Sequence, residues 1–256
     1  GQGTALVGLL NAFWESKGVA NAKEFRQFSA PVVPLARFSK AVYKNNEQFT
    51  ADIEIANYSS EEINNKNIKW ALTNASGQPL QEGIIPLTNI KIGGGNIAGK
   101  ISCSLSEVKK AERLTLRVSI ENSSYKNTWN IWVYPATLTI EKEEIVVTDK
   151  LTETQKALAA GKTVLFNPPY QLCAGLQGKF VPVFWSPVHF PKQAGTMGLL
   201  LDPTHKAFAH FPTEGHTNWQ WWSLTTQSRT LVIDSIYQHI TPVSYTHLRA
   251  HETLMN

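Results

Sequence analysis

The sequence predicts a β-sandwich over residues 31–135, followed by an α/β domain over residues 136–241. Apolar and polar side chains alternate with a period of two from about residue 38 to residue 135, which is typical of half-buried strands. Strand and helix patterns then alternate, which indicates a largely parallel sheet. With 256 residues and 42% apolar content, the chain is long enough to bury a core in each domain.

Residues 1–30 precede the sandwich and are loop-like, then helical. Phe25 and Phe28 lie three residues apart behind the polar Asn21, which predicts a short amphipathic helix. The prolines of the following APVVP segment break this pattern and mark a domain boundary.

The predicted sandwich strands share one pattern, in which every second residue is apolar. The pattern is clearest in QFTADIEIANY and LTLRVSI, is repeated in IKWAL around Trp70, and ends in TWNIWVYP. The predicted inward set comprises Phe49, Ala51, Ile53, Ile55, Leu114, Leu116, Val118 and Ile120. The intervening segments NYSSEEINNKN, NASGQP and ENSSYKN are rich in Asn, Ser and Gly, so we expect turns there.

Shorter patterns predict the α/β domain. EIVVT, TVLFNPP, KFVPVFWSP and TLVID are typical of strands. Between the first two, TETQKALAAG predicts a helix that begins with a capping box of Thr152 and Gln155 and ends at Gly161. MGLLLDPTHKAFAHFP predicts a further strand and then a helix with Pro203 near its first position.

Residues 94–102, GGNIAGKIS, satisfy most of the Gly-x-x-x-x-Gly-Lys motif of a phosphate-binding loop. Two features count against a nucleotide site. Ile101 occupies the position of the Ser or Thr that would hold magnesium, and the following residues alternate like a strand. Without a helix N-terminus the phosphate would lose its main stabiliser, so we favour a flexible loop of the sandwich.

Trp219, Trp221 and Trp222 lie within EGHTNWQWWSL. Tryptophan faces stack on sugar rings, so the cluster raises the hypothesis of carbohydrate binding, with burial in a core or between domains as the alternative. The spacing of the nearby histidines forms no metal-binding pattern, and we expect neither a metal nor a cofactor. Cys103 and Cys173 are predicted to be free, buried thiols.

Charge and hydropathy narrow the classes of partner. A net charge of +4 without a run of Lys or Arg does not predict a nucleic-acid partner. No apolar run reaches the roughly 18 residues that a membrane helix needs, so we expect no membrane insertion. The first residues lack the basic segment of a signal peptide and do not begin with Met, so we expect the chain to begin inside a longer protein.

Three stretches carry a resemblance to a known family. GQGTALVGLLNAFWESKG, followed by EFRQFSAPVVPLARF, resembles the end of the catalytic barrel in glycoside hydrolase family 2, the family of β-galactosidases, β-glucuronidases and β-mannosidases. The next segment resembles the immunoglobulin-like sandwich of these bacterial enzymes. FVPVFWSP, GLLLDPTHKAFAHFPTEGHTNWQWW and LVID resemble a set in their accessory α/β domain.

This resemblance covers residues 1–241 and implies a multi-domain fold. Residues 1–30 would be the last loop and helix of a TIM barrel, residues 31–135 an immunoglobulin-like β-sandwich, and residues 136–241 an incomplete Rossmann- or flavodoxin-like domain. The parent would be a retaining exo-glycosidase that hydrolyses β-linked sugars with two glutamates about 5–5.5 Å apart. Family members carry these glutamates on barrel strands that would lie upstream of residue 1.

We therefore assign no catalytic residue to this chain and expect it to be inactive by itself. Glu15 and Glu24 are interpreted as solvated surface charges. The resemblance implies a glycan substrate that binds through the missing barrel, and a bacterial parent protein in the periplasm or outside the cell. It is also compatible with a parent protein that forms a homo-oligomer. The alternative from another class is a non-catalytic carbohydrate-binding or scaffold module built from the sandwich and the tryptophan cluster.

The resemblance also places the opening loop at the C-terminal face of the barrel, where active sites form. It implies that Gln2, Thr4, Trp14 and Lys17 line the sugar pocket of the whole enzyme, with Trp14 as a platform for a sugar ring. Packing that closes the barrel is the alternative for Trp14. Without the other barrel strands, we expect residues 1–30 to be poorly anchored or to lie on the sandwich.

The tail SYTHLRAHETLMN places His247 and His251 four residues apart, a spacing that on a helix would favour a zinc site. Back-translation favours another origin, because Val243–Glu252 and the first bases of the Thr253 codon match a transposon-end adapter of sequencing libraries in frame. We therefore expect residues 242–256 to be an artefactual tail that interrupts the natural reading frame.

Overall fold

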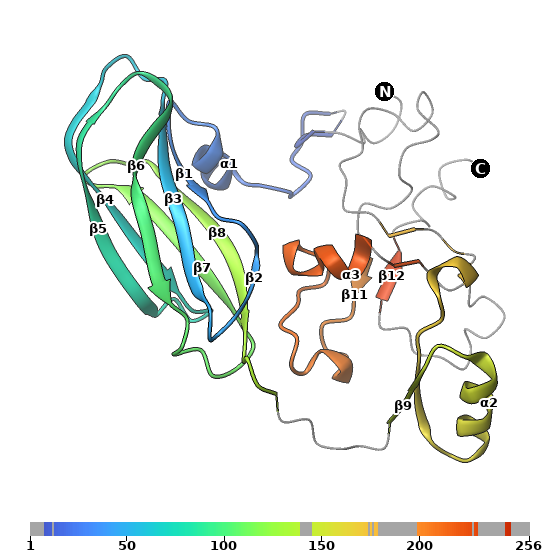
Figure 1. The fold of residues 1–256 in the computed structure, drawn as a ribbon. Helices are drawn as coiled ribbons and strands as arrows, with labels where there is room; N and C mark the ends of the chain where they lie inside the picture. Colours follow the sequence, from blue (N-terminus) through green and yellow to red (C-terminus); the bar gives the residue numbers. More distant parts are fainter. Residues whose placement is uncertain are drawn as a thin grey trace. The chain divides into compact units, whose positions relative to one another are not determined.

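The computed structural model describes residues 8–11, 13–138, 145–173, 175, 177–178, 199–226, 228–229 and 244–246. The chain divides into two compact units, Gly1–Ala136 with His210–Pro212, and Thr137–Ala209 with Thr213–Asn256. Strands predominate in the first unit and the helices of both units are short (Figure 1). In the described ranges, no helix is long and apolar enough to cross a membrane.

Two sheets of the first unit face each other as a β-sandwich (Figure 1). The first has the order β1-β3-β6, with bounds Val32–Arg37, Gln48–Asn57 and Gly93–Ser104. The second has the order β2-β8-β7-β4-β5, with bounds Val42–Lys44, Lys126–Tyr134, Glu112–Ile120, Ile63–Thr73 and Pro79–Ile90. Neighbouring strands are antiparallel, except that β2 pairs with β8 in parallel.

Every second residue of β3 and of β7 enters the core between the two sheets. The inward residues of β3 are at most 1% exposed and those of β7 at most 3%. They are Phe49, Ala51, Ile53, Ile55, Leu114, Leu116, Val118 and Ile120, so the predicted inward set is confirmed residue by residue. Apart from the small Ala51, each such side chain contributes about 1.5–3 kcal/mol by leaving water, which makes this core the main support of the sandwich.

The predicted turns are confirmed in two places and in part in a third, where residues 58–62 connect β3 to β4. Asn74 orders the turn between β4 and β5, since its Oδ1 accepts hydrogen bonds from the backbone N–H groups of Ser76 and Gln78. A turn also separates β7 from β8, as ENSSYKN predicts. In NYSSEEINNKN, however, β4 already begins at Ile63, because the Asn-rich end of this segment pairs with β5.

The helix α1 (Ala22–Phe28) confirms the short helix predicted before the sandwich. Asn21 caps it by accepting from two backbone N–H groups of the first turn, and the Glu24 carboxylate accepts from the Asn21 N–H at 2.8 Å. The helix lies beside β1 and β8 (Figure 1), where the Thr128 hydroxyl donates to Gln27 Oε1 at 2.8 Å. Of residues 1–30, the helix α1 therefore lies on the sandwich, which was one of the two alternatives expected for this segment.

The second unit contains a strand–helix–strand element with parallel strands, as predicted. Its parts are β9 (Ile145–Thr148), α2 (Leu151–Ala159) and β10 (Thr163–Phe166). The helix ends as expected at Gly161, whose φ of 71° is accompanied by Lys162 N–H donating to the Ala157 carbonyl.

The predicted capping box of α2 is wrong. The helix begins one residue before Thr152, and its N-cap residue Lys150 has no capping side chain. Thr148 on the preceding strand takes this part, because its hydroxyl accepts from the Lys150 N–H at 3.1 Å and donates to Glu153 at 2.7 Å. The cap therefore comes from the strand and not from the helix itself.

The segment after β11 (Leu199–Leu201) forms no α-helix at Pro203, contrary to the prediction. The Asp202 carboxylate accepts from the Thr204 N–H at 2.9 Å and so holds a turn. His205 then caps a single 3₁₀ turn, η2 (Lys206–Phe208), through its Nδ1. Two successive local caps leave too few residues for a longer helix.

Other predicted parts stay predictions. KFVPVFWSP and TLVID lie entirely outside the described residues, and a Rossmann-like sheet is a finer claim than one βαβ element. Likewise, α1 and the loop before it do not amount to a barrel end. In the tail, β12 (Ser244–Thr246) pairs antiparallel with β11, which does not test the adapter origin of these residues.

Candidate functional site

The predicted sugar-binding residues belong to the opening loop. Gln2 and Thr4 lie outside the described residues. Trp14 and Lys17 lie on a small hairpin, which the Lys17 N–H closes by donating to the Leu9 carbonyl at 3.0 Å. The Lys17 ammonium donates to the Gly8 carbonyl at 3.2 Å, so it is turned onto the backbone of its own loop.

Trp14 lies at the tip of this hairpin. Its side chain is 84% exposed and its φ is 65°, a strained conformation for a bulky residue. Asn11 holds the tip in place, because its Oδ1 accepts from the N–H groups of Phe13 and Glu15. The indole is therefore presented to solvent on an ordered loop, a geometry that suits stacking on a flat apolar face of a ligand.

The two glutamates of this region have structural partners. Glu15 accepts from the Asn11 side-chain amide at 2.8 Å, and Glu24 completes the capping box of α1. Both lie on the surface, as predicted, but each also fixes a piece of local backbone.

The flexible loop predicted at residues 94–102 is wrong, because these residues form part of β6 and pair with β3. Gly93, Gly95 and Gly99 adopt positive φ values of 120°, 75° and 157°, where the strand bulges. A Cβ at Gly99 would lie 2.8 Å from Ile85 Cγ2. The glycines therefore serve bulges and close packing, and no helix N-terminus follows that could hold a phosphate.

The tryptophan cluster divides into a buried residue and an exposed pair. Trp221, in the 3₁₀ turn η3 (Trp219–Trp221), is 9% exposed, and its Nε1 donates to the Thr213 hydroxyl at 2.9 Å. Trp219 and Trp222, the latter opening α3 (Trp222–Thr226), are 61% and 46% exposed. Their ring centroids are 6.0 Å apart and their planes are tilted by 34°. Trp221 therefore fits the alternative of burial in a core, whereas Trp219 and Trp222 are exposed enough for the hypothesis of carbohydrate binding.

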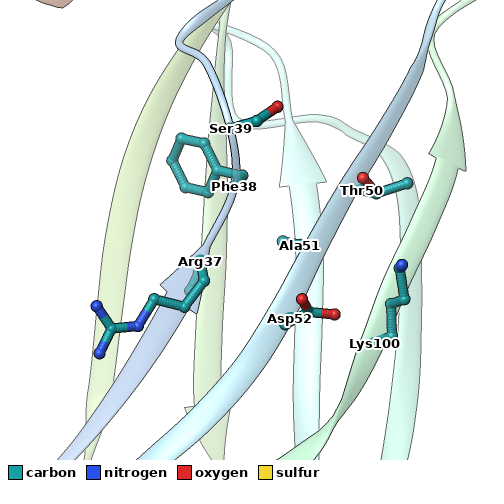
Figure 2. A pocket seen from close by; sticks show the side chains of 8 residues that line it. Arg37, Phe38, Ser39, Thr50, Ala51, Asp52 and Lys100 are labelled. Carbon is teal, nitrogen blue, oxygen red and sulfur yellow. The ribbon is translucent and has the colours of Figure 1, made fainter.

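A cleft of about 430 Å³ lies over the outer face of the three-stranded sheet (Figure 2). Arg37 on β1, Asp52 on β3 and Lys100 on β6 face one another in register. Figure 2 shows their side chains in one row across the three strands. The sequence shows three separate polar positions, and the row exists only because of the strand pairing.

This row is a charge-paired surface. Asp52 lies between two cations, and the neighbouring Glu54 already pairs with Arg37 at 3.1 Å. Acid–base hydrolysis of a glycoside needs two carboxylates with different tasks, one of them held neutral. No such pair is found among the residues that line the cleft, whose charged groups suit the binding of a polar group.

Two domain-family models match the chain. Residues 47–135 match the model of a domain of unknown function, DUF8488, and residues 146–246 match that of another, DUF8487. The first range lies within the sandwich, and the second runs from β9 to β12. Each of the two models matches less than half of the chain. No curated protein matches this chain.

Solved structures resemble the chain only slightly. The CARDB domain of a Pyrococcus furiosus protein is 9% identical, with a TM-score of 0.31 over 41% of this chain and 94% of that chain. The β-glucuronidase of Parabacteroides merdae is 11% identical, with a TM-score of 0.28 over 40% of this chain and 13% of that chain. The alkylpurine DNA glycosylase AlkC of Pseudomonas fluorescens is 10% identical, with a TM-score of 0.30 over 41% and 31%. The chain spans under a third of either enzyme, and likenesses of this size carry no functional argument.

Proposed function

We propose that the chain is the C-terminal accessory region of a retaining glycoside hydrolase that acts on β-linked sugars. The proposal depends on the resemblance of residues 1–18 to the end of a family 2 barrel. In this reading the catalytic glutamates lie upstream, and the chain itself performs no hydrolysis.

The observation that carries the proposal is the exposure of large apolar side chains on the opening loop. Leu10, Phe13, Trp14 and Val19 are 42%, 79%, 84% and 70% exposed. Four such side chains within ten residues are costly to hydrate, and contiguous exposed apolar groups mark surfaces that contact something else. A barrel preceding this loop would cover Leu10, Phe13 and Val19 and would leave Trp14 at the sugar pocket.

The strand order of the sandwich supports the immunoglobulin-like part of the proposal. One sheet places β3 between β1 and β6, which corresponds to strands A, B and E of an immunoglobulin domain. The other sheet places β7 between β4 and β8, which corresponds to strands C, F and G. Such a sandwich is well suited to a rigid spacer between larger domains.

Turnover of chromogenic aryl β-glycosides tests the proposal. The 256-residue chain is expected to give none, whereas the longer protein expressed from the natural gene is expected to be active. In the longer protein, Trp14→Ala should lower kcat/KM by up to about tenfold through loss of stacking, with Phe13→Ala as a matched control. Turnover by the purified chain alone would overturn the proposal.

A second candidate function is favoured by the exposed pair Trp219 and Trp222. Two indoles 6.0 Å apart form a platform on which the apolar faces of neutral sugars stack. Titration with neutral oligosaccharides, followed by tryptophan fluorescence, distinguishes the two candidates. A saturable fluorescence shift that disappears in Trp219→Ala but persists in Trp129→Phe would favour a binding module. If the fluorescence does not change, the pair Trp219 and Trp222 is assigned to packing.

A further inference from the structure

A groove of the first unit lies between α1 and the hairpin formed by β7 and β8. Its volume is about 510 Å³, within the range of small-ligand pockets. The helix supplies Lys23, Arg26 and Gln27, while the sheet and its turn supply Ser119, Ser124 and Lys126. The wall thus combines three cations with hydroxyl and amide groups, and no carboxylate lines it.

The three cations have no counter-ion in the described part of the chain. Lys23, Arg26 and Lys126 take part in none of its ion pairs or side-chain hydrogen bonds. The neighbouring carboxylates are engaged elsewhere. Glu24 accepts from the Asn21 N–H, and Glu121 pairs with Lys69 at 2.8 Å.

The walls of this groove are held in place before any ligand arrives. The Thr128 hydroxyl donates to Gln27 and so ties α1 to β8. In the turn, Ser123 donates to the Ile120 carbonyl at 2.7 Å and accepts from the Tyr125 N–H. Ser119 lies directly opposite Lys126 in the antiparallel register. An organised wall lowers the entropy lost on binding.

We propose that this groove binds an anionic saccharide that carries carboxylate or sulfate groups. The cations would neutralise the acidic groups, while Ser119, Ser124 and Gln27 would exchange hydrogen bonds with sugar hydroxyls. A nucleic acid is the less suitable ligand. A bound strand needs a longer basic track and aromatic platforms for its bases, and this groove is short.

The inference does not depend on the proposed function, because the groove would bind its ligand whether or not a parent enzyme cleaves sugars. The test is calorimetric titration of the 256-residue chain at about 50 mM NaCl, where charge effects are little screened. The probes are trigalacturonate, a sulfated chondroitin disaccharide, neutral cellotriose, inorganic sulfate and a short oligo-dT.

The informative variant is Arg26→Ala/Lys126→Ala, and its matched control is Lys91→Ala/Lys162→Ala, which removes the same charge at two residues that do not line the groove. Each groove cation should contribute about three- to fivefold in affinity, so the first variant should bind about tenfold or more weakly. The exposed pair Lys23→Gln/Arg26→Gln lies on a helix without buried residues and serves if the first variant fails to fold.

The expected result is binding of the carboxylated or the sulfated saccharide, weakened in the groove variants and unchanged in the control. The relative affinity of these two probes identifies which acidic group the groove prefers. Equal binding of cellotriose, equal loss in the control, or binding of oligo-dT or inorganic sulfate as tight as that of the saccharides would each overturn the inference.

Discussion

Alanine at Gly83 probes how closely β4 and β5 are packed. Gly83 lies directly opposite Trp70, and a Cβ there would lie 2.7 Å from Nε1 and 2.8 Å from Cε2 of the indole. Side chains do not approach this closely, so the indole or the strand must move. The Trp70 ring packs against the sandwich core, and overpacking of this kind costs about 1–3 kcal/mol.

The sign of this effect distinguishes steric conflict from strand propensity. Gly83 has no positive φ, so alanine would otherwise stabilise the strand by about 0.5–1 kcal/mol. We expect Gly83→Ala to lower the free energy of unfolding by about 2 kcal/mol and to become neutral or stabilising in a Trp70→Val background. Urea unfolding of the chain, followed by circular dichroism, measures the cycle.

Gly94→Ala is the control for that cycle, because the new Cβ would meet only the exposed hydroxyl end of Tyr58, at 3.3 Å. A side chain of this kind can swing away, so the cost should be small. If the effects of Gly83→Ala and Trp70→Val add within about 0.5 kcal/mol, the close contact does not govern this pair and the reasoning is refuted.

Three further predictions concern single residues. Asn57→Ala should lower the free energy of unfolding by about 1–3 kcal/mol in the same urea assay, because the buried Asn57 amide donates to the Glu61 carbonyl at 2.9 Å; an unchanged midpoint would contradict this. Gly161→Ala should cost about 1–2 kcal/mol, since φ is 71° there, and faster hydrogen exchange in α2 reports the loss. Burial raises the pKa of the Cys103 thiol from 9.0 to about 11, so its stabilising contribution is complete below pH 9 and is lost as pH rises towards 11; in urea unfolding at increasing pH, Cys103→Ala should make the fall in stability shallower, and an unchanged slope would contradict this.

The sandwich was predictable because its signal is local. Alternation such as that of Phe49 to Ile55 records which face of a strand is buried, whatever the strand pairs with. Pairing itself is not local. The start of β4 at Ile63 depends on β5, and the glycines of β6 look like a loop until β3 is beside them.

Caps were predictable where the capping side chain adjoins the helix. Asn21 adjoins α1 and Gly161 follows α2 directly, whereas the part that Glu24 plays in the cap of α1 was not predicted. Thr148 caps α2 from the end of a strand. Thr152 is closer to the helical pattern in the sequence and was therefore predicted as the cap. A sequence pattern can identify only capping residues that are close to the helix in the chain, whereas in the fold the cap comes from whichever side chain lies close in space.

The candidate sites divide in the same way. Trp14 could be named from the motif around it, but its exposure follows from the Asn11-held hairpin. The groove cations Arg26 and Lys126 are separated by a hundred residues and meet only because α1 lies on β8. Without that docking the sequence shows only scattered basic residues.

The central proposal is that a catalytic glycosidase barrel precedes these residues in the natural protein. The sequence of the natural gene upstream of this chain tests it most directly. The account predicts an open frame that encodes an eight-stranded barrel with a glutamate at the ends of its fourth and seventh strands. A frame that encodes no barrel, or a barrel that lacks either glutamate, would contradict the account.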